Sequence, residues 1–110
     1  MKTAELTDAS LDWAAAKAEG RTDVRVDDDG ELVGKDYFDY STDWSQGGPI
    51  IERERIATSY HPNPFQPGWE SWRASFAAWS CGGPTPLIAA MRCYVASKLG
   101  DEIEVPEKLK

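Results

Sequence analysis

The sequence predicts an α+β domain, in which a small antiparallel sheet packs with an N-terminal and a C-terminal helix. Three observations support this class: an apolar stripe of helical period near the start, short alternating segments in the middle, and an apolar segment with helix start and stop signals near the end. The order helix, strands, helix is typical of α+β domains. At 110 residues, the whole chain (1–110) is expected to form a single domain.

The first helix is predicted over residues 8–19. Its apolar residues recur at positions i, i+3, i+4 and i+7: Leu11, Ala14, Ala15 and Ala18. Thr7 or Asp8 can cap the start, and Gly20 stands where a helix often ends.

The middle of the chain contains the expected strands. Residues 24–26 alternate and meet a tight turn at 28–30, after which 31–33 can form the return strand. Residues 37–40 are an aromatic, extended segment, and residues 69–76 alternate as a further strand. The segment 50–56 is compatible with a short helix opened by Pro49 or with a strand.

Residues 60–68 must form a loop, because three prolines fall within six residues. The C-terminal helix begins after Thr85 as N-cap, with Pro86 in its first turn, and Gly100 ends it. Its expected inward face consists of Leu87, Ile88, Met91 and Val95. The tail, 103–109, is expected to pack as an extended arm.

Composition excludes several functions. The net charge of −7 argues against direct nucleic-acid binding, which depends on Lys and Arg at the phosphates. No apolar run is long enough to span a membrane and the N-terminus does not resemble a signal peptide, so a cytosolic location and no membrane partner are expected. Cys81, Cys93 and His61 fit no metal-binding spacing, so neither a metal nor a cofactor is expected.

The strongest functional signal is a repeated motif, Trp-Ser-x-Gly-Gly-Pro, at 44–49 and 79–84. A tryptophan can stack on a base, a hydroxyl can bind polar groups, and glycines let a phosphate approach backbone amides at a helix start. The predicted ligand-binding residues are Asp43, Trp44, Ser45, Gly47, Gly48, Trp79, Ser80, Gly82, Gly83 and Thr85. A purely structural interpretation also fits: Gly-Gly-Pro can end an irregular segment and start a helix, with the tryptophan covering the core.

No enzyme signature is found. Neither copy is a Walker loop, and the dinucleotide fingerprint is absent. Asp43, His61 and Cys81 are the candidates for catalysis, but nothing in their spacing joins them, so a non-enzymatic protein is favoured and no catalytic residue is assigned.

Three segments resemble the NinX-like bacteriophage and prophage proteins. They are 41–54, which contains the first motif, 83–102, and the opening 5–14 with 18–20. The resemblance implies a phage-encoded protein in the host bacterial cytoplasm. The family carries no assigned activity, so it supplies no catalytic residues.

Three functions remain open. The first is a non-enzymatic binder that sequesters a nucleotide-type small molecule as a counter-defence protein, with its site across a homo-oligomer interface. The second is an acidic protein–protein inhibitor of a host nucleic-acid or defence enzyme. The third is a small enzyme acting on a nucleotide.

Overall fold

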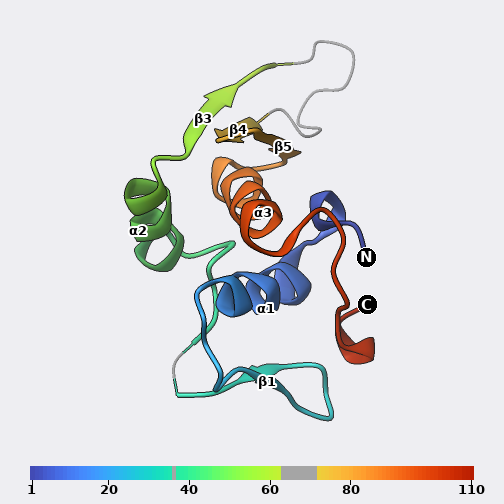
Figure 1. Ribbon diagram of the computed structural model, residues 1–110. Helices are drawn as coiled ribbons and strands as arrows, with labels where there is room; N and C mark the ends of the chain where they lie inside the picture. Colours follow the sequence, from blue (N-terminus) through green and yellow to red (C-terminus); the bar gives the residue numbers. More distant parts are fainter. Residues whose placement is uncertain (36, 63–71) are drawn as a thin grey trace.

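The computed structural model describes residues 1–35, 37–62 and 72–110. The described helices are α1 (Asp8–Ala18), α2 (Trp44–Glu54) and α3 (Pro86–Leu99), with 3₁₀ turns at Thr3–Glu5 and Glu107–Leu109. Strands β1 (Arg25–Val26) and β2 (Leu32–Val33) form one antiparallel pair; β3 (Ala57–Tyr60), β4 (Trp72–Phe76) and β5 (Trp79–Gly83) form an antiparallel sheet in that order. The predicted α+β class, with its N- and C-terminal helices, is confirmed (Figure 1).

The centre of the fold is α3, which lies between the three-stranded sheet and α1 (Figure 1). The predicted start and end are confirmed: Thr85 is the N-cap, and Gly100 follows with a φ of 93°. The predicted inward face was too narrow, because α3 is buried on all sides from Leu87 to Ala96 and is exposed only in its last turn. Helix α1 therefore packs on α3, and α3 in turn packs on the sheet.

Helix α1 packs against α3 through its small residues. Leu11, Ala14 and Ala15 are fully buried, as the helical spacing predicts. At the start, the Ser10 hydroxyl accepts a hydrogen bond from the Thr7 backbone N–H at 3.1 Å. The helix ends before Gly20, whose φ of 80° suits a glycine.

The predicted hairpin is present but short, with two residues in each strand. Its turn is closed by the Asp27 carboxylate, which accepts hydrogen bonds from the N–H groups of Asp29 (2.9 Å) and Glu31 (2.8 Å). Asp27 therefore has a structural role, because its carboxylate fixes the backbone of the turn.

Helix α2 settles the ambiguity at 50–56 in favour of a helix, but this helix begins at Trp44. Its N-cap is Asp43, whose carboxylate accepts from the Ser45 N–H at 2.9 Å. Pro49 therefore lies inside the helix and does not open it. Pro49 has no N–H to donate to the Ser45 carbonyl, so this helical hydrogen bond is absent. Ser45 and Pro49 are both exposed, so water can bind the free carbonyl.

Two strands were not predicted. The second copy of the motif, expected to be irregular, is strand β5, which pairs with β4 from Phe76↔Trp79 to Trp72↔Gly83. Strand β3 was missed because its residues are small or polar and all exposed, so no apolar alternation marks it. Residues 63–71, which include most of the predicted loop 60–68 and the first part of the predicted strand 69–76, lie outside the described residues.

The two ends of the chain are joined. The Met1 ammonium group donates to the Ile103 carbonyl at 2.9 Å, and the Thr3 hydroxyl donates to the Gly100 carbonyl at 2.6 Å. The predicted extended tail ends in a 3₁₀ turn at Glu107–Leu109. Within the described parts of the chain, no helix has the length and apolar character needed to cross a membrane.

Candidate functional site

The first copy of the motif forms the start of α2, and its two glycines have different surroundings. A Cβ atom on Gly47 would lie 2.5 Å from both the Leu87 Cδ1 atom and the Tyr40 carbonyl oxygen, so this glycine permits close packing of α2 on α3. A Cβ on Gly48 would lie 3.7 Å from the nearest atom, in the Trp44 ring. Trp44 itself is 55% exposed.

The second copy packs against the same end of α3. A Cβ on Gly83 would lie 2.8 Å from the Ala89 backbone nitrogen. The neighbouring Gly82 carbonyl accepts from the buried Arg92 guanidinium at 2.9 Å. The Thr85 hydroxyl accepts from the Ile88 N–H at 3.1 Å and so caps the helix. One glycine of each copy, Gly47 and Gly83, thus permits close packing on α3.

Trp79 and Ser80 of the second copy line a hollow of about 410 Å³, within the usual range for small-molecule sites. The hollow lies between β5, the N-terminal segment and the residues that follow α3. Its lining residues are Lys2, Thr3, Ala4, Trp79, Ser80, Cys81, Ala96, Asp101 and Glu102. The remaining predicted site residues, Asp43, Trp44, Ser45, Gly47, Gly48, Gly82, Gly83 and Thr85, do not line it.

The hollow offers a planar indole, a hydroxyl, a thiol, two carboxylates and an ammonium group. The Arg73 guanidinium donates from Nη2 to the Ser80 hydroxyl at 3.2 Å, but Arg73 does not line the hollow. Strands β3, β4 and β5 carry no Asp or Glu, so both carboxylates of the hollow come from the segment after α3. Sequence reasoning missed Lys2, Asp101 and Glu102, since their place depends on the pairing of the chain ends; the Lys2↔Glu102 bridge belongs to that pairing.

Cys81 and Cys93 face one another where β5 packs on α3, and both thiols are free. A hydrogen bond from Cys93, aided by the positive charges of Arg73 and Arg92, lowers the pKa of Cys81 to about 7 against the opposing effect of burial. The same hydrogen bond, together with burial, raises the pKa of Cys93. Cys81 is therefore the thiol that ionises first.

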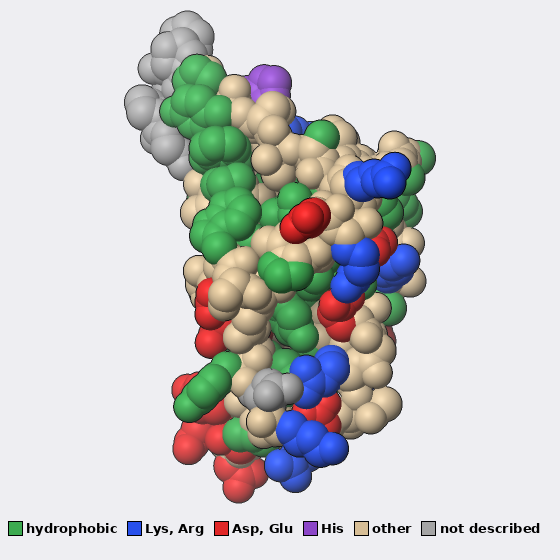
Figure 2. All heavy atoms as spheres, turned by 90° about the vertical axis from the view of Figure 1, so that its left-hand side faces the viewer, with side chains coloured by type: hydrophobic (Ala, Val, Ile, Leu, Met, Phe, Trp, Pro, Cys, Tyr) green, Lys and Arg blue, Asp and Glu red, His purple; other side chains and the backbone are tan. Residues whose placement is uncertain are grey.

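A second hollow, of about 430 Å³, is acidic. Four carboxylates line it, from Asp8, Asp12, Glu31 and Asp39. Burial raises the pKa of Asp12 to about 6, although the hydrogen bond from the Ser41 backbone N–H favours the ionised form. Figure 2 shows acidic side chains at the lower left of one face, over the β1–β2 hairpin, with Lys and Arg side chains beside them; the upper end near β3 is mostly hydrophobic or uncharged.

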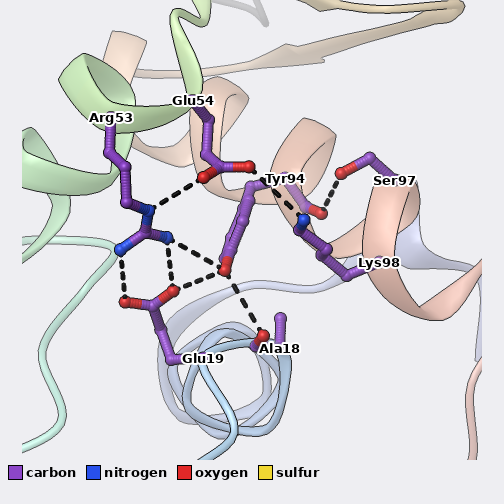
Figure 3. Close-up of polar contacts among 7 residues, drawn as sticks. All are labelled: Ala18, Glu19, Arg53, Glu54, Tyr94, Ser97 and Lys98. Carbon is purple, nitrogen blue, oxygen red and sulfur yellow. Dashed lines mark hydrogen bonds and ion pairs between the residues drawn. The ribbon is translucent and has the colours of Figure 1, made fainter.

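A polar network joins the ends of α1 and α2 to α3 (Figure 3). Arg53 forms two hydrogen bonds with the Glu19 carboxylate, at 2.6 and 3.1 Å, and pairs with Glu54 at 2.8 Å. The Tyr94 hydroxyl donates to Glu19, and burial raises its pKa. Tyr94 is 1% exposed, so we interpret this network as a structural link between three helices.

The three residues considered for catalysis have separate partners. Asp43 caps α2, the Ser59 hydroxyl is hydrogen-bonded to the His61 ring at 2.7 Å, and Cys81 contacts Cys93. Among the residues that the structure describes, no group of three or more His, Cys, Asp or Glu side chains is placed to hold a metal ion.

Comparison with known proteins identifies the family. Residues 2–98 match the family described as "Bacteriophage P22, NinX". No curated protein matches the sequence significantly. The match covers most of the chain, including both copies of the motif and all the elements around α3, and the chain therefore belongs to the NinX family of phage proteins.

Proposed function

We propose that this phage protein is a non-enzymatic binder of a nucleotide-type small molecule, and that the hollow beside β5 holds the ligand. The observation that carries the proposal is the grouping of Trp79 and Ser80 with two carboxylates and an ammonium group around one hollow of suitable size. Those groups suit the base, the ribose and the phosphate of a nucleotide.

Each part has a partner of suitable chemistry. A base can stack on the Trp79 indole, which contributes about 1–3 kcal/mol per base in known complexes. Ribose hydroxyls can donate to Asp101 and Glu102, as they do to an acidic residue in dinucleotide-binding folds. Phosphate oxygens can then pair with the Lys2 ammonium group, which lines the hollow.

Sequestration by a phage protein would lower the free concentration of such a molecule in the infected cell. A counter-defence role against a host pathway that signals with a nucleotide follows from the proposal. Binding without turnover is preferred, because Asp43, His61 and Cys81 each have separate partners.

The proposal is tested by measuring tryptophan fluorescence and thermal stability with mono-, di- and cyclic nucleotides and ADP-ribose. A ligand at 100 times its Kd should raise the free energy of unfolding by about 2.7 kcal/mol. Ala4→Trp, which fills the hollow from an exposed position, and Lys2→Glu should abolish the effect. Trp44→Ala, which removes the exposed tryptophan of the first copy, should leave it unchanged.

Failure of every ligand to bind would refute the proposal. A ligand whose binding survives Ala4→Trp but is lost with Trp44→Ala would refute the location of the site.

The acidic hollow favours a second candidate function, in which a basic side chain of a host protein binds in the hollow and the host protein is inhibited. Its four carboxylates lie beside Tyr37, which is 82% exposed and can pack on such a partner. Binding to a basic host enzyme should then weaken with salt and be lost in Glu31→Lys and Asp39→Lys. Binding that does not respond to either change would exclude this hollow as the contact.

A further inference from the structure

The Cys81–Cys93 pair is not used by the proposed nucleotide site. A buried cysteine often acts only as a small apolar side chain. Here, however, two thiols from different elements lie next to each other, one on β5 and one on α3. Cys81 is 7% exposed and also lines the hollow, whereas Cys93 does not line it.

The two thiols occupy different positions relative to solvent. Cys93 is completely buried in α3, and its sulfur lies 3.6 Å from the Trp79 carbonyl oxygen, the acceptor for its proton while Cys81 is itself protonated. Cys81 lines the hollow, and Cys93 does not. A reagent that enters the hollow therefore meets Cys81 before Cys93.

We propose that Cys81 is a redox modification site that reacts with low-molecular-weight disulfides of the glutathione type, and that Cys93 resolves the adduct into a Cys81–Cys93 disulfide. This proposal does not rest on the proposed nucleotide binding, although both use the same hollow, and the test is made without a nucleotide.

The chemistry is a thiol–disulfide exchange in two steps. The Cys81 thiolate attacks one sulfur of the small disulfide, whose S–S bond breaks, and one thiolate leaves and is protonated by solvent. Cys93 loses its proton, attacks the Cys81 sulfur and expels the second small thiol. Two cysteine thiols are oxidised, and one small disulfide is reduced to two thiols.

Electrostatics favours attack by Cys81 first and by Cys93 second. The hydrogen bond from Cys93 and the charges of Arg73 and Arg92 lower the pKa of Cys81 to about 7, so it is substantially ionised at neutral pH. Once Cys81 is part of a mixed disulfide it carries no negative charge. The interaction with Cys81, the main cause of the raised pKa of Cys93, is then removed, and Cys93 can ionise more readily.

The test is incubation of the full chain with oxidised glutathione, followed by intact mass spectrometry. The wild-type protein should become lighter by two hydrogens and retain no glutathione. Cys93→Ser should keep one glutathionyl group, and Cys81→Ser should remain unmodified. Urea-unfolded protein is the control, since both of its thiols should react.

A second measurement needs no variant. Alkylation of Cys81 in the folded wild-type protein, followed by peptide mapping, should increase with a midpoint near pH 7, the pKa of its thiol, and below that of the unfolded chain.

An unmodified wild-type protein would overturn the proposal, as would a stable glutathionyl adduct on it. Equal reaction of Cys81→Ser and the wild type would overturn the order of attack.

Discussion

Replacement of Asp12 by asparagine should stabilise the protein at neutral pH. Asp12 is 6% exposed, and its carboxylate accepts from the Ser41 backbone N–H at 2.8 Å. Burial, with smaller contributions from Asp39 and Asp8, raises its pKa from 3.8 to about 6. Asp12→Asn keeps an oxygen acceptor for Ser41 and removes the charge.

The direction in which the free energy of unfolding changes with pH follows from proton binding by Asp12. Because the pKa is higher in the folded protein, the folded state binds the proton more tightly than the unfolded chain does. Stability that this proton supplies is present at low pH and is lost as pH rises through the folded pKa of about 6. At about 1.4 kcal/mol per pKa unit, the rise from 3.8 to about 6 corresponds to about 3 kcal/mol.

The assay is urea unfolding of both proteins across this pH range. The free energy of unfolding of Asp12→Asn, minus that of the wild type, should increase by about 2.4 kcal/mol between about pH 4 and about pH 7, because part of the full change of about 3 kcal/mol already lies below about pH 4. Asp43→Asn is a control of opposite sign, because hydrogen bonds from Ser45 lower the pKa of Asp43 and its contribution is lost on acidification. A difference that does not change with pH for Asp12→Asn, or that decreases, would refute the reasoning.

Three further predictions concern the packing of α3. Gly47→Ala places a methyl group against the Tyr40 carbonyl oxygen and should destabilise the fold by about 1–3 kcal/mol in urea unfolding. Gly48→Ala is the matched control, because its methyl group has free space, and it should be neutral or stabilising by up to about 1 kcal/mol. Equal effects of the two substitutions would disprove the packing role of Gly47. Tyr94→Phe removes the hydroxyl between α1 and α2 and should cost about 1–3 kcal/mol, and a smaller loss would mean that Arg53 and Glu19 hold the helices alone. Thr85→Ala should cost about 1 kcal/mol through loss of the N-cap without weakening nucleotide binding; weaker binding in the folded variant would return Thr85 to the site.

The helices next to clear end signals were predictable from sequence. Thr7 and Gly20 bracket α1, and Thr85 and Gly100 bracket α3, because caps depend on residues close in the chain. Strand β3 was not predictable, since pairing with β4 fixes it and its residues are exposed on both faces. Long-range pairing leaves no local trace in such a sequence.

The candidate site was predicted in part. Trp79 and Ser80 were identified by the motif, and the structure places both on a hollow. Lys2 and Glu102 complete that hollow from opposite ends of the chain, and no local pattern relates them. The contact between Cys81 and Cys93 is likewise set by the packing of a strand on a helix.

The repeated motif has one packing role in two conformations. A helix turns by about 100° per residue and a strand alternates its faces, so in either conformation two adjacent glycines point to different sides. In α2 the first glycine, Gly47, meets α3, and in β5 the second glycine, Gly83, meets it. The glycine pair thus lets either element approach α3 closely. The tryptophans differ in their surroundings, since Trp44 is exposed and Trp79 lines the hollow. Ligand binding, if it uses the motif, should therefore depend on the second copy, and the repetition itself is explained by packing.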